Sequence, residues 1–296
     1  MARSVGVLAT RYLWAGIVED TKLDAVRMFP NPGQPQIDLK GIPAEEILAI
    51  LRRQIGELCQ SGPIESVGAG FPGVLRCGVI EESPNLSQLK GLRVADRLRA
   101  GLKADGIDVP VIALNDADAL ATGIAATRDT LDRTVRVWYL GDGIGYGRHP
   151  HTDGIWEAGH IVVTLDPKEH YCGCGGVGHL EGIMGHRAMR LRFLDMEPEE
   201  VFLAAHQGNP RALEFCKLWH RALAAATATS VHLDGPGRFY IAGPNADFVD
   251  LNLLGNLMHE MVAMTPLQGS YFEIVQTSHD LALIGAAVAS RIEPRP

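Results

Sequence analysis

The segment "EAGHIVVTLDPKEHYCGCGGVGHLEG", residues 157–182, ends in a glycine-rich loop. Within residues 171–182, Cys172 and Cys174 lie among five glycines, and a histidine and Glu181 follow them. A loop this rich in glycine buries few side chains, so packing alone does not hold it in one conformation. Another interaction must therefore fix the loop.

A metal ion is the interaction that these residues favour. His160, Cys172, Cys174 and His179 offer two imidazoles and two thiols, which is the ligand set of a closed, tetrahedral zinc site. Spacing alone leaves two alternatives open. The fourth ligand is either His179 or His170, and the cysteines are otherwise two surface thiols beside incidental histidines.

Length and composition indicate a globular protein. The 296 residues suffice for two domains or one large one, with 46% apolar and 21% charged residues. A net charge of −8 argues against a nucleic-acid partner bound through a basic face. No apolar run approaches the roughly 18 residues of a membrane helix, so neither a nucleic acid nor a membrane is expected as a partner.

The cysteines indicate the compartment. Five are scattered along the chain, and an odd, dispersed set suits a reducing compartment better than a disulfide framework. We therefore expect a cytoplasmic protein, in which Cys59, Cys77 and Cys216 are small buried hydrophobic residues. We do not expect the N-terminal stretch to be a signal peptide, because Arg11 interrupts its apolar run, and its pattern predicts two strands.

Strands and helices alternate along the chain, which predicts an α/β fold with mixed sheets. Three glycine loops end strands at 70–73, 141–147 and 242–245, and we expect them to floor one cleft. A domain boundary is expected after Asn115-Asp116. The predicted strands cover 4–10, 12–20, 66–75, 109–115, 135–140 and 238–243, and the predicted helices cover 43–60, 91–106, 116–127, 185–194, 197–206, 210–231 and the chain from 279.

The segment 157–182 resembles the signature of the ROK family, which holds sugar kinases and sugar-responsive repressors. That signature has Glu-x-Gly-His, a Cys-x-Cys-Gly loop, a third cysteine and a glutamate. The segments "AGFPGVL", "SPNL", "NDADALATG", "GDGIGYG" and "LALIGAAVA" follow the family's order. The third cysteine position holds His179, an adequate zinc ligand, so the resemblance implies a structural Cys2His2 zinc site.

The resemblance implies a two-domain actin-like ATPase fold, like that of sugar kinases and hexokinase, with a central cleft. Residues 1–116 are the smaller N-terminal α/β domain, completed by the C-terminal helix at about 279–296. Residues 117–278 are the larger α/β domain with the zinc loop. No winged-helix segment precedes the first strand, so a DNA-binding repressor is not expected, and the family implies a homodimer.

A dipeptide at a strand end is the candidate catalytic site. Open α/β sheets bind ligands at strand ends, and a kinase needs a carboxylate that accepts a proton from the sugar hydroxyl. Asp116 matches the family's catalytic base and Asn115 its neighbouring sugar contact. The alternative is that the two residues only cap a helix.

Three side chains around the metal loop match the family's sugar ligands. Glu157 and His160 are near neighbours if their segment makes one helical turn, and Glu181 follows the cysteines. A carboxylate accepts two hydroxyl protons, and a metal-bound imidazole keeps one N–H to donate to a sugar. The alternative is that both glutamates are solvated surface residues. Gly73 and Ser83 align with further sugar-side positions.

The nucleotide side departs from the family. Its kinases have an aspartate and a Gly-Gly-Thr turn near the N-terminus, where this chain has Leu8 and Thr10-Arg11-Tyr12. Glycines let backbone N–H groups approach phosphate, whereas bulky residues block them. The second phosphate loop keeps Gly143 and Gly145, and Gly243 lies in the third glycine loop, but Asp142 replaces a threonine. A carboxylate about 5 Å from a phosphate costs roughly 3 kcal/mol at an effective dielectric of about 20.

In one hypothesis, Asp142 of the second loop replaces the aspartate that is missing at Leu8 in the first loop, and ATP still binds. Mg²⁺ between Asp142 and the phosphates turns repulsion into coordination, and Arg11 neutralises phosphate charge. In the alternative, Arg11 is a solvated residue of a hairpin turn.

These patterns favour an ATP- and Mg²⁺-dependent kinase of a hexose, amino sugar or cyclitol. A second hypothesis is a sugar-binding pseudokinase that acts as a sensor or partner. A third is an enzyme that acts on a sugar without ATP. The altered first loop distinguishes the first two hypotheses, because only the kinase has to bind the nucleotide.

Overall fold

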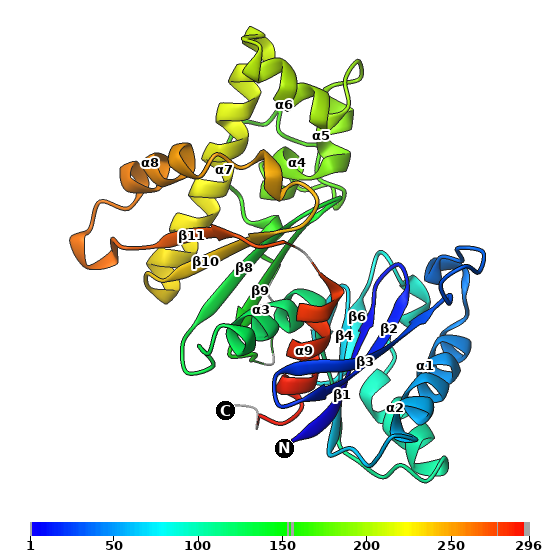
Figure 1. Cartoon of the computed structure of the whole chain (residues 1–296). Helices are drawn as coiled ribbons and strands as arrows, with labels where there is room; N and C mark the ends of the chain where they lie inside the picture. Colours follow the sequence, from blue (N-terminus) through cyan, green and yellow to red (C-terminus); the bar gives the residue numbers. More distant parts are fainter. Residues whose placement is uncertain (1, 153, 155–156, 277, 293–296) are drawn as a thin grey trace. The chain divides into compact units, whose positions relative to one another are not determined.

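The computed structural model describes residues 2–152, 154, 157–276 and 278–292. They form two compact units, which Figure 1 draws with their labelled elements. The first comprises Met1–Val135, Gly147–Trp156 and Ser278–Pro296, and the second comprises Arg136–Tyr146 and Glu157–Thr277. Among the described residues, no helix combines the length and the apolar character needed to span a membrane.

The first unit contains a five-stranded sheet, in the order β3-β2-β1-β4-β7. The β1–β2 and β2–β3 pairs are antiparallel, whereas β1–β4 and β4–β7 are parallel, so the last two strands end at the same edge. A separate hairpin, β5–β6, follows β4. The strands are β1 (Arg3–Ala9), β2 (Leu13–Glu19), β3 (Lys22–Phe29), β4 (Ser66–Phe71), β5 (Val74–Arg76), β6 (Val79–Glu82) and β7 (Val111–Asn115).

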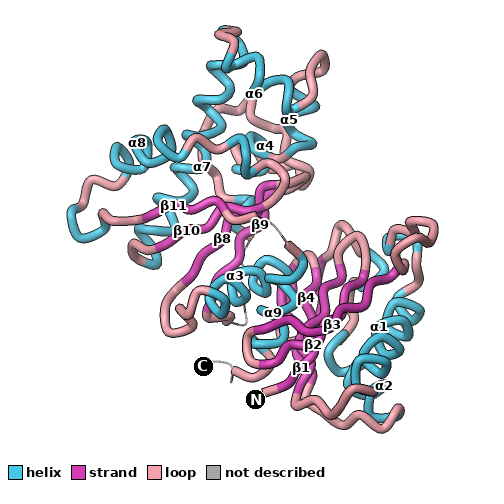
Figure 2. The backbone as a smooth tube through the Cα atoms, viewed as in Figure 1, coloured by secondary structure: helices cyan, strands magenta, loops and turns pink. Residues whose placement is uncertain are grey.

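Helices cover both faces of this sheet. α1 and α2 pack together on one face and α3 and α9 on the other, as the ribbon and tube views show (Figures 1 and 2). The helices are α1 (Ala44–Cys59), α2 (Val94–Ala104), α3 (Asp116–Thr127) and α9 (His279–Ala289), with short 3-10 turns η1 (Leu39–Gly41) and η2 (Ser87–Leu89).

Glycines let α9 approach the sheet backbone closely. A Cβ atom at Gly6 of β1 would lie 1.9 Å from the carbonyl oxygen of Leu283, and one at Gly68 of β4 would lie 1.8 Å from that of Ala286. No side chain fits at either position. The C-terminal helix is therefore seated on the central strands of the first unit, backbone against backbone.

The second unit has a four-stranded sheet, in the order β11-β10-β8-β9. Its strands are β8 (Val135–Leu140), β9 (Ile144–His149), β10 (Arg238–Ala242) and β11 (Tyr271–Ile274). Its helices are α4 (Leu180–Met184), α5 (His186–Arg192), α6 (Pro198–His206), α7 (Pro210–Asp234) and α8 (Leu251–Met261), with 3-10 turns η3 (Ala158–His160), η4 (Ala246–Phe248) and η5 (Thr265–Leu267).

The long helix α7 forms much of the core of the second unit. Trp219 of α7 and Trp138 of β8 are fully buried in one apolar cluster. The indole N–H of Trp138 donates to Oγ1 of Thr227, 3.0 Å away, so its burial leaves no unpaired donor. This packing supports β8, which leads directly into the glycine loop at 141–145.

Most predicted elements are confirmed, including α1, α2, α5, α6, α7 and α9. The sequence did not predict β3, β9, β11, the β5–β6 hairpin, α4 or α8. β3 and β11 are edge strands with partly exposed patterns, so their alternation is weak. The expectation of three buried cysteines is wrong for Cys77, which is exposed with φ of 50° between β5 and β6, whereas Cys59 and Cys216 are half-buried.

The compact units differ from the expected domain boundary. α3 groups with the first unit, whereas the boundary was expected after its first residue, Asp116. α3 packs against α9, and an added Cβ at Gly123 of α3 would lie 1.8 Å from the carbonyl oxygen of Leu281. A division at residues 1–116 and 117–278 stays a prediction.

Candidate functional site

Four predicted metal ligands converge in the second unit. The ligand atoms of His160, Cys172, Cys174 and His179 all lie within 4.8 Å of one another. Sγ of Cys172 is 3.4 Å from Nδ1 of His160 and 3.4 Å from Sγ of Cys174, and the latter is 3.2 Å from Nδ1 of His179. The group has the composition and compactness of a metal site.

The group fits zinc. Zn–S bonds of about 2.3 Å and Zn–N bonds of about 2.0 Å place tetrahedral ligands about 3.5–3.8 Å apart, close to the observed separations. Burial raises the pKa of the Cys172 thiol to about 12, and a bound dication reverses this by holding the thiolate. The backbone N–H of Gly176 lies 3.4 Å from Sγ of Cys174 and supports negative charge there.

A short antiparallel pairing frames the metal loop. Val162 pairs with His179, and the N–H of Val163 donates to the carbonyl of Gly178 at 2.8 Å. Gly178 has φ of +73°, and a Cβ there would lie 2.0 Å from the carbonyl oxygen of Thr164. Glycine is therefore required where the two segments meet.

A buried ion pair anchors the loop to α5. The guanidinium of Arg192 donates to both carboxylate oxygens of Glu169, one of them 3.0 Å away, and lies over the ring of Tyr171. His170 stacks on Tyr171 with ring centroids 5.0 Å apart and is outside the metal group. The geometry therefore favours His179 over His170 as the fourth ligand.

The three predicted sugar ligands of the second unit also lie together. His160 turns Nδ1 toward the sulfur of Cys172 and Nε2 toward Oε2 of Glu157, 3.7 Å away, because η3 makes the expected single turn. The side chain of Glu157 is 41% exposed. Partial desolvation raises the pKa of its carboxyl, His160 lowers it and the charge of Glu181 raises it. Two carboxylates and one imidazole therefore share one environment beside the metal group.

The glycine loop between β8 and β9 is braced by buried polar contacts. Asn245 is 1% exposed, and its side-chain amide donates to the carbonyl of Gly141 at 3.3 Å. Gly243 has φ of +100°, and a Cβ there would lie 2.3 Å from the carbonyl oxygen of Leu140. The predicted nucleotide residues Asp142, Gly143 and Gly145 therefore adjoin the loop of Gly243, and Asp142 is exposed.

In the first unit, the ends of β4 and β7 bring four predicted residues together. Oδ1 of Asn115 accepts from the N–H of Ala117 at 2.8 Å and so caps α3, while its Nδ2 donates to the carbonyl of Gly73. Asp116 is the first residue of α3, at the strand end. Ser83 is 2% exposed and donates to the carbonyl of Pro72, next to Gly73.

The β1–β2 turn does not resemble a phosphate cradle. Leu8 is 4% exposed, so a buried apolar side chain stands where the resemblance to the family implies an aspartate. The Arg11 side chain is 71% exposed, and its Nε lies 3.4 Å from a carboxylate oxygen of Asp38. A role for Arg11 at phosphate stays a prediction.

Two residues near the glycine loop escaped the sequence analysis. They are Asn245 and His186, whose Nδ1 lies 3.3 Å from Oδ1 of Asn245 and whose backbone N–H donates to the carbonyl of Gly141 at 3.0 Å. The only sequence signal was a polar residue following the Gly-Pro turn after β10. His186 also groups with Glu197 and Glu199, both exposed acids.

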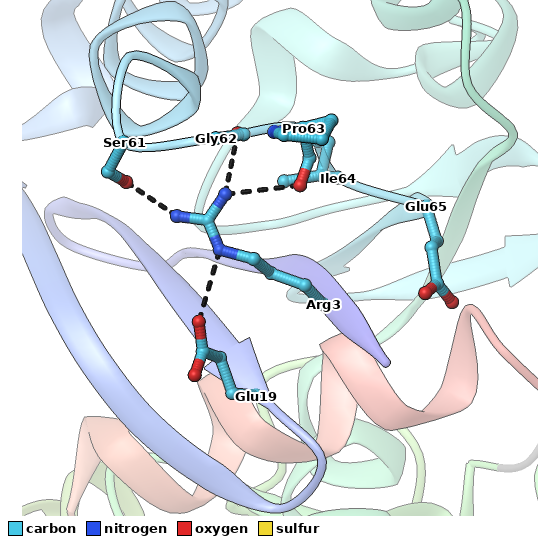
Figure 3. A pocket seen from close by; sticks show the side chains of 7 residues that line it. All are labelled: Arg3, Glu19, Ser61, Gly62, Pro63, Ile64 and Glu65. Atoms are coloured by element: carbon cyan, nitrogen blue, oxygen red, sulfur yellow. Dashed lines mark hydrogen bonds and ion pairs between the residues drawn. The ribbon is translucent and has the colours of Figure 1, made fainter. Parts of the chain in front are cut away.

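A separate pocket of about 420 Å³ lies in the first unit, beside β1 and the loop after α1 (Figure 3). The guanidinium of Arg3 spans it, donating to the carbonyls of Gly62 and Pro63 and to Oγ of Ser61. Its Nε lies 3.3 Å from Glu19. These contacts tie β1 to the loop, so the arginine is structural.

The fold and the site together define an α/β protein in which two cysteines and two histidines cluster beside two carboxylates. The profile of the ROK family matches residues 16–291, and the chain belongs to this family. It is 27% identical over 257 residues to a glucokinase of Pyrobaculum calidifontis, covering 81% of this chain and 83% of that protein. The chain is therefore a sugar kinase-like member of the ROK family.

Solved structures define the fold. The ROK hexokinase from Thermus thermophilus superposes with a TM-score of 0.79 at 21% identity, covering 98% of each chain. A ROK family glucokinase from Streptomyces griseus, in complex with glucose and AMPPNP, gives a TM-score of 0.66 at 21% identity, covering 98% of this chain and 99% of that one. The chain has the actin-like ATPase fold of these sugar kinases.

Proposed function

We propose that this protein transfers the γ-phosphoryl group of Mg-ATP to a hydroxyl of a hexose, an amino sugar or a cyclitol. One observation carries the proposal: Glu157, His160 and Glu181 gather beside a preformed Cys2His2 group. Two carboxylates and an imidazole N–H accept from and donate to several hydroxyls in a fixed geometry, which suits a polyol.

The first unit supplies the remaining sugar-side groups. Asn115 contacts the sugar, and Gly73 and Ser83 shape its surroundings. Asp116 accepts the proton of the attacking hydroxyl, because phosphoryl transfer depends on a positioned base together with charge stabilisation. Its place at the end of β7 and the start of α3 supports this role.

Zinc fits the four ligands His160, Cys172, Cys174 and His179. When bound, it supplies a structural cross-link for a loop that its own side chains do not hold. This chain's residues do the rest: His160 orients toward Glu157, and the loop carries Glu181 beside them. The thiolates need a reducing compartment, which supports the cytoplasm as the location.

The nucleotide side relies on the second unit. Asp142, Gly143, Gly145 and Gly243 face the phosphates, with Asp142 as a ligand of Mg²⁺. Magnesium supplies charge neutralisation between the phosphate oxygens when bound. The exposed carboxylate of Asp142 on a loop braced by Asn245 supports this assignment.

A sugar-binding pseudokinase is the second candidate, and the first loop favours it. Leu8 is a buried apolar residue that offers no group to phosphate, and the Nε of Arg11 lies 3.4 Å from a carboxylate oxygen of Asp38. Such a protein binds the sugar as a sensor or partner without transferring phosphate. An enzyme that acts on the sugar without ATP keeps Asp116 and the same sugar ligands.

Calorimetry with a panel of sugars, repeated with Mg-ATP, tests the proposal. Under the kinase proposal the sugar binds in the micromolar to millimolar range and Mg-ATP binds as well. Sugar binding without any nucleotide binding selects the pseudokinase or the ATP-independent enzyme. Binding of neither ligand rejects all three. We also propose a homodimer, which sedimentation of the same preparation tests.

A further inference from the structure

The carboxylate of Glu181 lies between two loops. Its Oε2 accepts a hydrogen bond from the backbone N–H of Ile144 at 3.1 Å, and its Oε1 lies 3.6 Å from Sγ of Cys172. Ile144 begins β9, directly after the glycine loop, whereas Cys172 belongs to the metal group. One side chain therefore touches the proposed phosphate loop and the proposed metal site together.

Gly143 provides the space for this carboxylate. A Cβ atom at Gly143 would lie 2.5 Å from Oε2 and 3.3 Å from Cδ of Glu181, and these are the nearest atoms outside the loop. The separation of 2.5 Å is shorter than any normal contact between these atoms, so a side chain at 143 displaces Glu181. Glycine at position 143 is therefore required for the observed position of the Glu181 carboxylate, whether or not the loop binds phosphate.

The helix that carries Glu181 is fixed on both sides. A Cβ at Gly182 would lie 2.9 Å from the backbone nitrogen of Cys172, and one at Gly185 would lie 2.8 Å from the carbonyl oxygen of Asp142. The N–H of His186 then donates to the carbonyl of Gly141 at 3.0 Å. The ends of α4 are therefore in close contact with both loops, so a shift of the metal loop also displaces Glu181.

We propose that Glu181 couples occupancy of the metal site to the conformation of the phosphate loop. With metal bound, the loop of Cys172 is rigid, and its backbone, packed against Gly182, keeps α4 in place and so holds the carboxylate of Glu181 on the amide of Ile144, which fixes the backbone of Gly143–Ile144. Without metal, the carboxylate loses this support and the amide exchanges freely with solvent. Glu181 is thus a positioning residue for the nucleotide side, in addition to its proposed contact with the sugar.

The coupling rests on the proposed metal site and is reciprocal, because linkage between two sites acts equally in both directions. Whatever displaces Glu181 from Ile144 must weaken the metal site. Gly143→Ala is the sharpest probe, since it leaves every metal ligand and Glu181 itself in the chain. Gly141→Ala is its matched control in the same loop, where the atoms nearest to an added Cβ belong to Tyr139 at 3.2 Å and Pro244 at 3.7 Å.

Hydrogen exchange at the amide of Ile144 is the primary test, with zinc-loaded protein. Removal of a bond to a carboxylate should speed exchange by about tenfold or more. We expect this acceleration in Glu181→Ala and Gly143→Ala but not in Gly141→Ala, with the amides of β4 unchanged throughout. Chelation of zinc should produce it in the wild type and add nothing in Glu181→Ala.

The reciprocal measurement is zinc affinity, determined by competition with a chromophoric chelator. Gly143→Ala should weaken it several-fold, and Gly141→Ala should not. Unchanged Ile144 exchange and unchanged zinc affinity in Gly143→Ala overturn the coupling, as does a zinc-dependent exchange rate that persists in Glu181→Ala.

Mg-ATP titration of the same variants separates this coupling from the proposed kinase function. If the nucleotide binds, its affinity should fall with zinc removal in the wild type and not in Glu181→Ala. If the nucleotide binds to none of them, the kinase proposal fails, while the exchange and zinc measurements still decide the coupling.

Discussion

The side-chain amide of Asn115 donates to the backbone carbonyl of Gly73, 2.9 Å away, while its oxygen accepts from the N–H of Ala117. One residue therefore both caps α3 and ties the end of β7 to the loop after β4. The two roles assigned to Asn115 from the sequence, helix cap and sugar contact, are compatible, because the cap fixes the side chain at the strand end.

Asn115→Ala should lower the free energy of unfolding by about 1–2 kcal/mol, because the cap and the tie to Gly73 are both lost. Asn115→Asp keeps the cap oxygen and loses the amide donor, so its loss should be smaller. Urea denaturation measures both. Equal stability of the two variants would show that the cap contributes nothing.

Asp116→Asn should lower the rate of phosphoryl transfer by about 10²–10⁴-fold if the side chain acts as the base. The amide oxygen still accepts the N–H of Ala117, which Oδ1 of Asp116 accepts at 3.0 Å, so the fold should persist. A coupled kinase assay and sugar calorimetry measure the two effects. Undiminished transfer would exclude Asp116 as the base.

Cys172→Ser should release zinc and lower the melting temperature, because structural zinc contributes folding free energy directly. His179→Ala should do the same. His170→Ala is the control and should retain one zinc per chain, since His170 stacks on Tyr171 outside the metal group. Metal analysis and thermal denaturation measure these effects. Zinc loss in His170→Ala would identify His170, and not His179, as the fourth ligand.

Asp142→Thr tests whether the carboxylate of Asp142 coordinates Mg²⁺ or only repels the phosphates. If Asp142 binds Mg²⁺, the substitution should weaken Mg-ATP binding and reduce activity, because Leu8 offers no second carboxylate. If Asp142 only repels phosphate, the roughly 3 kcal/mol removed should strengthen binding by about a hundredfold. We expect the first outcome, and calorimetry with Mg-ATP gives the sign.

His220 should make the protein less stable below neutral pH. It is 3% exposed, and burial lowers its pKa. Its Nδ1 lies 2.8 Å from the carbonyl of Cys216 and its Nε2 accepts from the N–H of Asp250 at 2.8 Å, which requires a neutral ring.

The unfolded chain therefore binds the proton more readily than the folded one. The stability due to neutral His220 is present at neutral pH and is lost as the pH falls below about 6.5. The urea concentration at the midpoint of unfolding should fall less between pH 7 and pH 5 in His220→Gln than in the wild type. The matched control His232→Gln, exposed on the same helix with the same kind of bond to a carbonyl, should follow the wild type.

The metal group was predictable because its four ligands belong to two short segments of distinctive composition. Likewise the pairing of Glu157 with His160 follows from a spacing of three residues. The bond between Glu181 and Ile144 was not predictable, since it joins residues 37 positions apart through the packing of α4. Sequence periodicity reports which face of an element is buried, but not which backbone amide a carboxylate will reach.

The nucleotide side illustrates the same limit. The loss of the aspartate at Leu8 was visible in the sequence, whereas the ion pair of Arg11 with Asp38 depends on how the chain returns from β3 to η1. Asn245 gave almost no signal, because a single buried amide leaves no period in a sequence.

The close packing of α9 on Gly6 and Gly68 affects the order in which the two units fold during translation. These glycines lie on β1 and β4, and the backbone that fills the space above them is made last among the described elements. On the ribosome the second unit has all its strands and helices before α9 emerges, while the first unit, although begun earlier, has one sheet face covered by α3 alone. We therefore expect the half that is translated first to finish folding last, with its central strands exposed to chaperones until α9 arrives.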